Sequence, residues 1–384
     1  MMTGTMGMFT FATASTIHAG SGAAAQIGEE AAKRGSRALV VTGSNQRRVE
    51  SVVGTLPVPS EWFSVSGEPD VESVQQGAQL AVKRGCDVVI AVGGGSAIDA
   101  GKAIAALMTN SESIMTYLEV IGEGKPIAHQ PAPFIAVPTT AGTGAEVTRN
   151  AVLYSKEHGI KVSMRSEKML PDVAIVDPQL TVTMPPQVTA STGLDALTQL
   201  IEPFVSHRSN PLTDALCEAG LVRAARSLRR AFDSSADIAA REDMSIASLF
   251  GGLALANAGL GAVHGFAGPM GGMFPIPHGV VCGRLLPFVF KANIAALGDA
   301  PDKLARFRKV SQLLTQDANA SVQQGTDWLN NLCTHLGVDG LSKFGVEPVH
   351  FNDIVEASKR ASSMKGNPVV LSDEALRKIL AQAL

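Results

Sequence analysis

The chain has 384 residues and a formal net charge of −3; 45% of its residues are hydrophobic and 17% are charged. A chain of this length usually forms more than one hydrophobic core, so we expect two domains. The small net charge excludes a general attraction to polyanions, and we therefore expect no nucleic-acid partner.

The cysteines and the N-terminus indicate the compartment. The four cysteines are far apart and form no C-x-x-C pair, which excludes a zinc knuckle or a dithiol redox motif. Residues 1–20 have no basic segment ahead of an apolar run and so do not resemble a secretory signal. We expect reduced, mostly buried thiols and a cytoplasmic location.

In the first half of the chain, runs rich in β-branched residues alternate with segments of helical periodicity. Strands are expected at residues 37–43 and 87–95, and at the start of 133–146 and of 171–186. Helical patterns lie between them, for example at residues 71–85 and 96–108. This order predicts a parallel sheet covered by helices on both faces.

After Pro186 the sequence shows helical periodicity with almost no strand signal. The expected fold class is therefore an α/β domain with a parallel sheet over residues 1–186, followed by an all-α domain over residues 187–384. Ligand sites commonly lie in the cleft between two such domains.

Residues 249–283 carry no formal charge and could be mistaken for a membrane span. The segment is rich in glycine and contains three prolines and two histidines, which would leave backbone groups unsatisfied in lipid. We predict a buried helix, a loop and a second helix, and no membrane partner.

Residues 87–107, DVVIAVGGGSAIDAGKAIAAL, run from a predicted strand through three glycines into a predicted helix. Backbone N–H groups in such a loop can approach an anion, with Ser96 capping the helix; the alternative is a tight turn without a ligand. The run matches neither G-x-G-x-x-G, because Ile98 takes the third glycine position, nor the P-loop pattern. Asp99 and Lys102 share one helix face, and their simplest interpretation is a solvated ion pair.

A second loop follows the next predicted strand and contains the hydroxyl side chains of Thr139, Thr140 and Thr143. Hydroxyl groups after a buried strand suit hydrogen bonding to phosphate or ribose at the carboxyl edge of a sheet. The composition alone is also that of an ordinary loop, but two such loops on neighbouring strands are less common.

Polar residues that could bind a metal occur in the second half. Asp195 and Gln199 are four residues apart on a predicted helix, with Glu202 on the same side. His264 and His278 come from separate segments joined by a glycine-rich turn, so they can converge. Imidazole with carboxylate suits Fe²⁺, Zn²⁺ or similar ions. The alternative is two core histidines and a helix acid near a polar contact.

Five segments in fixed order resemble the iron-containing, or group III, alcohol dehydrogenases. They are GGGSAIDAGKAIA at 93–105, PTTAGTGAEVT at 138–148, the D-P-x-L of 177–180, TGLDALTQLIE at 192–202 and HGFAGPMGGMFPIPHG at 264–279. The resemblance extends from about Phe9 to the C-terminus. It implies a dehydroquinate synthase-like fold, with a dinucleotide-binding α/β domain, a helical metal-binding domain and hydride transfer in the cleft.

The resemblance also implies roles for the two loops. The NAD(P) pyrophosphate would lie against Gly94, Gly95 and Ser96. Phosphate and ribose hydroxyls would be held by Thr139, Thr140 and Thr143, the nicotinamide end would lie toward Asp99, and the cofactor would be lined by Lys161 and Leu180. A homodimer is the expected assembly.

The metal ligands implied by the resemblance are Asp195, Gln199, His264 and His278, with Asp195 and both histidines as catalytic residues. Gln199 stands where the family usually has histidine, so the ion is bound loosely, or Gln199 supports a water, or the site works without metal. A further histidine often relays the proton, and Gly268 stands in its place. A water chain or a cofactor ribose hydroxyl would then carry the proton.

The substrate and the coenzyme are less defined. The implied reaction interconverts an alcohol and an aldehyde or ketone, with Fe²⁺ preferred and Zn²⁺ as the other ion. Gly43 and Ser44 follow the first predicted strand where an NAD-selective enzyme would have an acidic residue, so NADP is expected to be tolerated. Apolar residues near the ligands suit small aldehydes or primary alcohols, or are core residues; they are Phe266, Met270, Met273 and Phe274.

Three other functions are open at this point. One is a metal-independent NAD(P)H reductase of the maleylacetate reductase type, which the missing histidine favours and Asp195 opposes. A lyase resembling dehydroquinate synthase shares the architecture, but the chain has few basic residues beside the ligands for a phosphate-bearing substrate. A nucleotide-binding protein without catalysis is the third.

Overall fold

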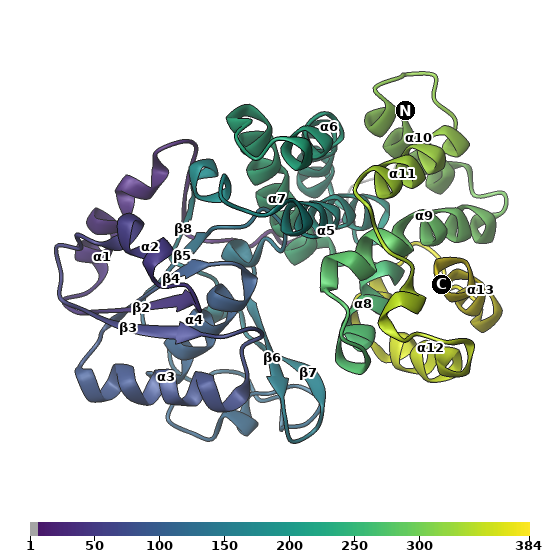
Figure 1. Cartoon of the computed structure of the whole chain (residues 1–384). Helices are drawn as coiled ribbons and strands as arrows, with labels where there is room; N and C mark the ends of the chain where they lie inside the picture. Colours follow the sequence, from purple (N-terminus) through teal and green to yellow (C-terminus); the bar gives the residue numbers. More distant parts are fainter. Residues whose placement is uncertain (1–6) are drawn as a thin grey trace.

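The computed structural model describes residues 7–384, and its first half contains a six-stranded parallel sheet, on the left in Figure 1. The strand order is β1-β8-β5-β4-β2-β3. The strands are β1 (Thr16–Ala19), β2 (Ala38–Gly43), β3 (Ser60–Val65), β4 (Val88–Gly93), β5 (Phe134–Pro138) and β8 (Val173–Val176). The predicted parallel sheet is confirmed, but β1 and β3, the two edge strands, were not among the expected ones.

Helices cover both faces of this sheet, as predicted. They are α1 (Ile27–Arg34), α2 (Arg47–Val53), α3 (Val71–Arg84) and α4 (Gly95–Leu107). Side chains alternate between the faces along each strand. Leu39 and Val41 of β2 therefore belong to the core under α3 and α4, whereas Val40 between them belongs to the core under α1 and α2.

A two-stranded antiparallel hairpin, β6 (Asn150–Ser155) and β7 (Ile160–Arg165), extends from the sheet domain. The sequence interpretation did not include it. Alternate residues of β6 are buried, and the hairpin packs against α4. It therefore covers a part of α4 that would otherwise face solvent.

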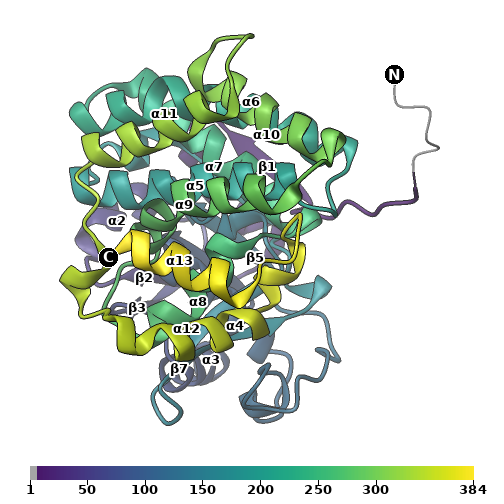
Figure 2. The same ribbon diagram turned by 90° about the vertical axis from the view of Figure 1, so that its right-hand side faces the viewer.

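The second half is helical and lies on the right in Figure 1. Its helices are α5 (Pro186–Val205), α6 (Pro211–Asp233), α7 (Ile238–Ala258), α8 (Ala262–Met273), α9 (His278–Leu297), α10 (Pro301–Thr315), α11 (Val322–His335), α12 (Phe351–Arg360) and α13 (Asp373–Ala383). α5 is buried along most of its length and packs on α6, α7 and α9. Figure 2 looks onto this half, with the strands behind it.

The uncharged residues 249–283 contain the end of α7, all of α8 and the start of α9, so they have two breaks where the sequence predicted one loop between two helices. α7 and α8 meet at a bend of 99°. α9 is long and apolar enough to cross a membrane, but more than half of it is buried inside the helical half. The apolar side chains of α9, such as Leu285 and Phe290, belong to the core shared with α5.

The expectation about a secretory signal concerns residues 1–20, of which residues 1–6 lie outside the described part of the chain.

Candidate active site

The glycine loop (residues 93–96) and the threonine loop (residues 139–143) lie side by side at the carboxyl edge of the sheet. β4 and β5 are adjacent parallel strands, and Gly93 at the end of β4 pairs with Pro138 at the end of β5. The Thr139 N–H donates a hydrogen bond of 2.8 Å to the Gly93 carbonyl oxygen. The two loops therefore form one surface at the edge where ligands of α/β sheets bind.

α4 begins one residue before Ser96. Gly94 is the N-cap, with an extended backbone and no side-chain hydrogen bond, and Gly95 is the first helical residue. The expectation that Ser96 caps the helix is wrong, because the extended Gly94 already turns the chain into the helix. The N–H groups of an uncapped first turn are left to water or to an anion.

Two threonines approach the glycine loop closely. A Cβ atom on Gly95 would lie 2.9 Å from both Cγ2 and Oγ1 of Thr143, and one on Gly94 would lie 3.4 Å from Cγ2 of Thr140. Gly95 is therefore required by the spacing of the loops. The predicted cofactor residues Gly94, Gly95, Thr140 and Thr143 are brought together.

Asp99 and Lys102 do not form a solvated pair, so that interpretation is wrong. The Lys102 side chain is 1% exposed, and its Nζ donates to the carbonyl oxygens of Ala145 at 2.9 Å and Asn150 at 2.8 Å. Asp99 Oδ2 accepts from the Val152 N–H at 3.0 Å. The physical reason is the hairpin, which covers this face of α4 and takes up its polar groups.

Burial shifts the pKa values of this cluster. Loss of solvation raises the pKa of Asp99 and lowers that of Lys102, while their mutual attraction opposes both changes. Burial also raises the pKa of Glu146 to about 7, against the opposing effects of a backbone hydrogen bond and of Lys102. These groups lie directly behind the two loops.

Lys161 and Leu180 lie apart from each other on the sheet domain. Lys161 Nζ on β7 donates to Glu68 Oε1 at 2.9 Å, and a Cβ atom on Gly271 of α8 would lie 3.5 Å from it. Lys161 therefore faces the helical half. Leu180 lies on a short 3-10 helix (Pro178–Thr181) after β8, half-buried against the core under α1 and α2. This turn is held by Asp177, whose Oδ2 accepts from the N–H groups of Gly22 and Ala24.

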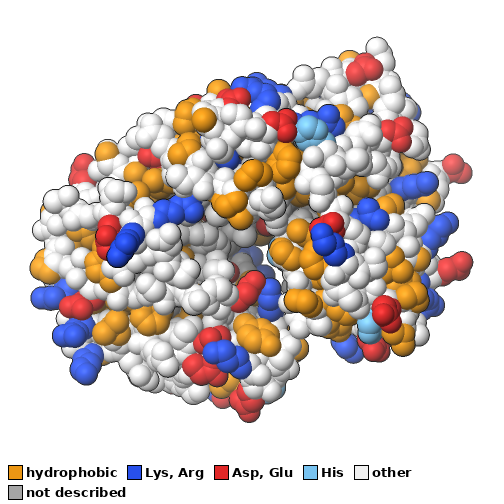
Figure 3. Space-filling model, viewed as in Figure 1, with side chains coloured by type: hydrophobic (Ala, Val, Ile, Leu, Met, Phe, Trp, Pro, Cys, Tyr) orange, Lys and Arg blue, Asp and Glu red, His pale blue; other side chains and the backbone are white. Residues whose placement is uncertain are grey.

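The threonine loop reaches the first long helix of the second half. A Cβ atom on Gly142 would lie 2.6 Å from the Cβ atom of Thr192 on α5, so loop and helix are in direct contact. Thr192 precedes Asp195 by three residues, which is about one turn. Figure 3 shows the surface hollowed between the two halves of the molecule.

About one turn along α5 from Thr192, side chains from three helices form a cluster of four. Asp195 comes from α5, His264 from α8, and His278 and Cys282 from the first turns of α9. One ligand atom of each lies within 4.8 Å of the others. Asp195 Oδ1 is 3.1 Å from His264 Nε2 and 3.8 Å from His278 Nε2. The structure thus brings together the two histidines and the aspartate that the sequence singled out.

Glu202 supports the cluster from behind. Its Oε2 lies 2.7 Å from His264 Nδ1, and its Oε1 accepts from the Val263 N–H at 2.6 Å. Because a carboxylate only accepts, Nδ1 of His264 carries a proton and Nε2 faces Asp195. A carboxylate that orients an imidazole in this way is typical of metal sites.

The cluster attracts positive charge. Burial opposes ionisation of Asp195, but the hydrogen bond with His264 and the charge of His278 keep its pKa below the usual value. Burial also opposes protonation of His264, but Cys282, Asp195 and Glu202 outweigh it and raise its pKa well above the usual range. The site therefore favours a bound proton or a cation.

Gln199 lies one turn after Asp195 on α5 and is 3% exposed. Its Oε1 accepts no hydrogen bond from the described residues. A Cβ atom on Gly251 of α7 would lie 3.1 Å from the Gln199 Cβ, so the side chain is packed closely against that helix. Gln199 is thus a buried amide with an unpaired acceptor.

Sequence reasoning missed Cys282 as part of the cluster, since a lone cysteine in an apolar helix reads as a core thiol. The available signal was its position four residues after His278, which places both side chains on one helix face.

The four apolar residues that the sequence placed near the ligands differ in their exposure. Phe266 and Met270 are fully buried core residues, whereas Met273 is 47% exposed. Phe274 is half-buried with its ring against His350.

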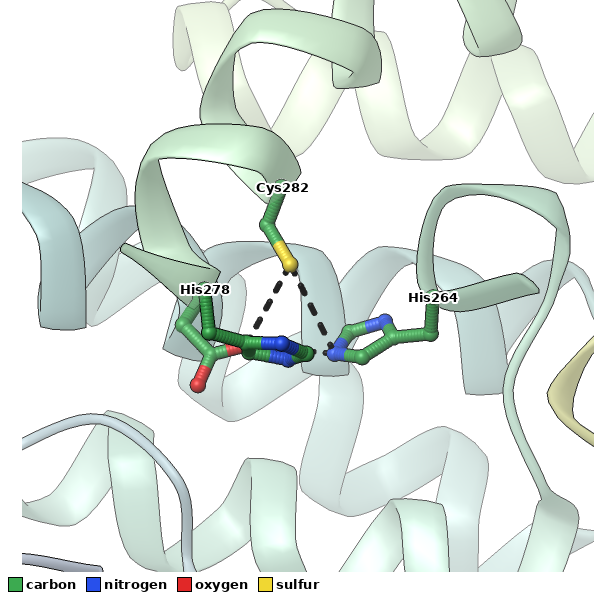
Figure 4. A group of neighbouring side chains, drawn as sticks. His264, His278 and Cys282 are labelled. Atoms are coloured by element: carbon green, nitrogen blue, oxygen red, sulfur yellow. Dashed lines mark hydrogen bonds and ion pairs between the residues drawn. The ribbon is translucent and has the colours of Figure 1, made fainter. Parts of the chain in front are cut away.

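The donor set fits a divalent cation. One carboxylate, two imidazoles and one thiol lie around a common centre. The amide oxygen of Gln199, which accepts no hydrogen bond from the described residues, lies one turn away on α5. These are the ligand types that bind zinc and iron in proteins. Figure 4 shows Cys282 directed between the rings of His264 and His278.

Comparison with known proteins agrees with this architecture. Residues 14–178 match the family model of iron-containing alcohol dehydrogenase, and residues 189–384 match that of the C-terminal region of the Fe-containing alcohol dehydrogenase family. The choline dehydrogenase of Bacillus subtilis (strain 168) is 32% identical over 379 residues, which cover 95% of this chain and 92% of that protein.

Solved structures give the same result. The crystal structure of a 1,3-propanediol oxidoreductase has a TM-score of 0.92 and 31% identity, covering 98% of this chain and 100% of that chain. Sulfoacetaldehyde reductase from Bifidobacterium kashiwanohense, solved in complex with NAD⁺, has a TM-score of 0.89 and 30% identity, covering 98% of this chain and 99% of that chain. Neither the maleylacetate reductase type nor a non-catalytic protein is favoured by these matches. The chain belongs to the iron-containing alcohol dehydrogenases and is an oxidoreductase of that family.

Proposed function

We propose that this enzyme interconverts an alcohol and an aldehyde or ketone with NAD(P)(H) and a divalent metal ion. One observation supports this most directly: the threonine loop at the sheet edge touches α5 at Thr192, one turn from the cluster of Asp195, His264 and His278. A dinucleotide on the loops and an ion in the cluster would meet across that contact. The division into residues 1–186 for the coenzyme and 187–384 for the metal is part of the proposal.

The coenzyme would be held by the residues at the sheet edge. The free N–H groups at the start of α4, with Gly94, Gly95 and Ser96, suit the pyrophosphate. Thr139, Thr140 and Thr143 supply hydroxyls for phosphate and ribose. Asp99, Lys161 and Leu180 complete the proposed cofactor set.

The substrate oxygen would be held at the side-chain cluster. The metal-holding residues are Asp195, His264 and His278, with Gln199 as the fourth position that the family resemblance gives. A bound ion would act as a Lewis acid and lower the pKa of a coordinated alcohol. Glu202 keeps the proton on Nδ1 of His264, so that Nε2 is presented to the centre. The His278 side chain is 37% exposed, so substrate would enter from its side of the cluster.

The family often has a histidine that relays the proton at the position of Gly268. In this chain proton transfer would therefore follow another route. Gly268 is exposed, and a Cβ atom there would meet no atom within 4 Å. This open space suits a water chain from the substrate oxygen to solvent.

Small alcohols and aldehydes are the proposed substrates. Three of the similar proteins act, by their names, on the small molecules choline, 1,3-propanediol and sulfoacetaldehyde, whereas another is named a long-chain-alcohol dehydrogenase. We further propose a cytoplasmic location and a homodimer. Light scattering of the purified protein would test the dimer.

NADP(H) is proposed to be accepted as well as NAD(H). β2 ends at Gly43, and no carboxylate follows at Ser44 to repel a 2′-phosphate. Initial rates with NADH and NADPH at one aldehyde concentration decide this. Activity with NADH and none with NADPH would contradict it.

The test of the function uses metal-stripped protein and a panel of short aldehydes, titrated anaerobically with Fe²⁺ and then with Zn²⁺ while NAD(P)H oxidation is followed. Activity only with metal supports the proposal, and equal activity without metal contradicts it. His264→Ala should abolish turnover while NADH binding is retained. Turnover by that variant would show that the ligand assignment is wrong.

A further inference from the structure

We propose that the thiolate of Cys282, and not Gln199, completes the metal site with Asp195, His264 and His278. This inference rests on the proposed metal dependence and concerns a ligand that the family resemblance does not assign. It also implies a preference for Zn²⁺ over Fe²⁺.

The distances fit a four-coordinate site. In a tetrahedral zinc site with bonds of about 2.0–2.3 Å, neighbouring ligand atoms lie roughly 3.3–3.8 Å apart. Asp195 Oδ1 lies 3.1 Å from His264 Nε2 and 3.8 Å from His278 Nε2. Cys282 Sγ lies 3.7 Å from Asp195 Oδ1 and 3.9 Å from His264 Nε2. All four ligand atoms, that of His278 included, lie within 4.8 Å of one another.

The surroundings of Cys282 differ from those of other thiols in the chain. Cys86 and Cys333 donate to backbone carbonyl oxygens, of Ala38 and Gly283. Cys282 is fully buried, and within residues 7–384 the partners of its sulfur are two of the candidate ligands. Its position four residues after His278 places both side chains on the same face of α9.

Gln199 is the weaker candidate as a donor. An amide oxygen is neutral and binds a divalent ion less strongly than a thiolate, which is a typical zinc ligand. The Gln199 side chain is packed against α7 at Gly251, whereas Cys282 Sγ lies within 4.8 Å of the other three ligand atoms.

The sulfur ligand sets the metal preference. Thiolate is a soft donor that favours Zn²⁺, and Zn²⁺ also lies above Fe²⁺ in the general affinity order of divalent ions. Binding requires loss of the thiol proton, which passes to solvent as the metal enters.

The experiment replaces the ion in the full-length enzyme with Co²⁺ and records the near-ultraviolet and visible spectrum. Wild type should show an intense sulfur-to-cobalt charge-transfer band. Cys282→Ser should lack this band and bind Zn²⁺ at least about tenfold more weakly. Cys217→Ser, which changes another buried thiol of the helical half, should keep the band.

A second measurement keeps the inference testable if Cys282→Ser fails to fold. X-ray absorption at the zinc edge of wild type should show one sulfur neighbour at about 2.3 Å together with nitrogen and oxygen neighbours. Stoichiometric zinc with nitrogen and oxygen neighbours only would overturn the Cys282 assignment and leave the proposed function standing. An active enzyme that binds no metal would overturn both.

Discussion

At the scale of single residues, Glu202 links His264, a proposed metal ligand, to the backbone of α8. Its two oxygens accept from His264 Nδ1 and from the Val263 N–H. A glutamine in its place can accept one of these bonds, but its NH₂ group would then face the other donor. A buried donor without a partner costs about 1–3 kcal/mol.

We therefore expect Glu202→Gln to weaken metal binding by about 10–100-fold, as loss of a supporting carboxylate typically does. Isothermal titration of stripped protein with Zn²⁺ measures this, and kcat should fall with it. The matched control is Glu218→Gln. Glu218 lies on α6, is more exposed than Glu202 and pairs with Lys309 of α10. Equal zinc affinity in both variants would contradict a positioning role for Glu202.

Glu146 is predicted to make stability depend on pH. Burial raises its pKa to about 7 from an ordinary value of 4.5, in a cluster with Lys102 and Asp99. Between these two pH values the unfolded chain releases the proton and the folded chain keeps it, so the free energy of unfolding falls as pH rises from 4.5 to 7. Each pKa unit corresponds to about 1.4 kcal/mol, so the total is about 3 kcal/mol.

Glu146→Gln removes this ionisation and should be more stable than wild type at pH 8 by up to about 3 kcal/mol, with little difference at pH 4.5. Urea denaturation at the two pH values provides the comparison. The exposed Glu157→Gln serves as control and should follow wild type. A gap between Glu146→Gln and wild type that does not change with pH would show that Glu146 keeps no proton in the folded state.

At the scale of elements, the start of α4 depends on the absence of a side chain at Gly95. An added Cβ would lie 2.9 Å from Thr143, and such overpacking costs about 1–3 kcal/mol. Gly95→Ala should therefore raise the Kd for NADH about tenfold, measured by fluorescence titration. Gly94→Ala, where the nearest atom would be at 3.4 Å, should disturb the loop spacing less. Unchanged NADH affinity in Gly95→Ala would place the coenzyme elsewhere.

The central strands could be predicted from sequence because they are buried on both faces, so their sequences are unbroken runs of apolar residues. β4 is one such strand, with all six residues buried. The edge strands β1 and β3 are mostly half-buried and have no comparable run. The burial of Lys102 could not be foreseen either, since it depends on the hairpin of β6 and β7, which lies 48–63 residues further along the chain.

The candidate site could also be predicted only in part from the sequence. Asp195, His264 and His278 could be selected because polar side chains are unusual in such apolar segments. Cys282 is compatible with a core in any helix, and only the packing of α5, α8 and α9 shows that its sulfur faces the ligands. A side chain that suits the core as well as the site gives no signal in the sequence.

At the scale of the whole molecule, the proposed metal ligands lie in one core and the proposed coenzyme loops border another. The ligand-bearing helices α5, α8 and α9 share a single hydrophobic core, whereas β2, β4 and β5 build the cores of the sheet domain. An ion that binds only the folded state stabilises it by about 4 kcal/mol at a thousand times its Kd.

Metal removal should therefore destabilise the folded enzyme, whose two halves also share a core between β8 and α7. In differential scanning calorimetry, chelation should lower the melting temperature by about 5 °C for 4 kcal/mol, and added Zn²⁺ should restore it. Asp195→Asn lacks one ligand, so its melting temperature should not respond to the chelator. If chelation strips the metal from wild type and the melting temperature does not move, the ion is not held by α5, α8 and α9 together.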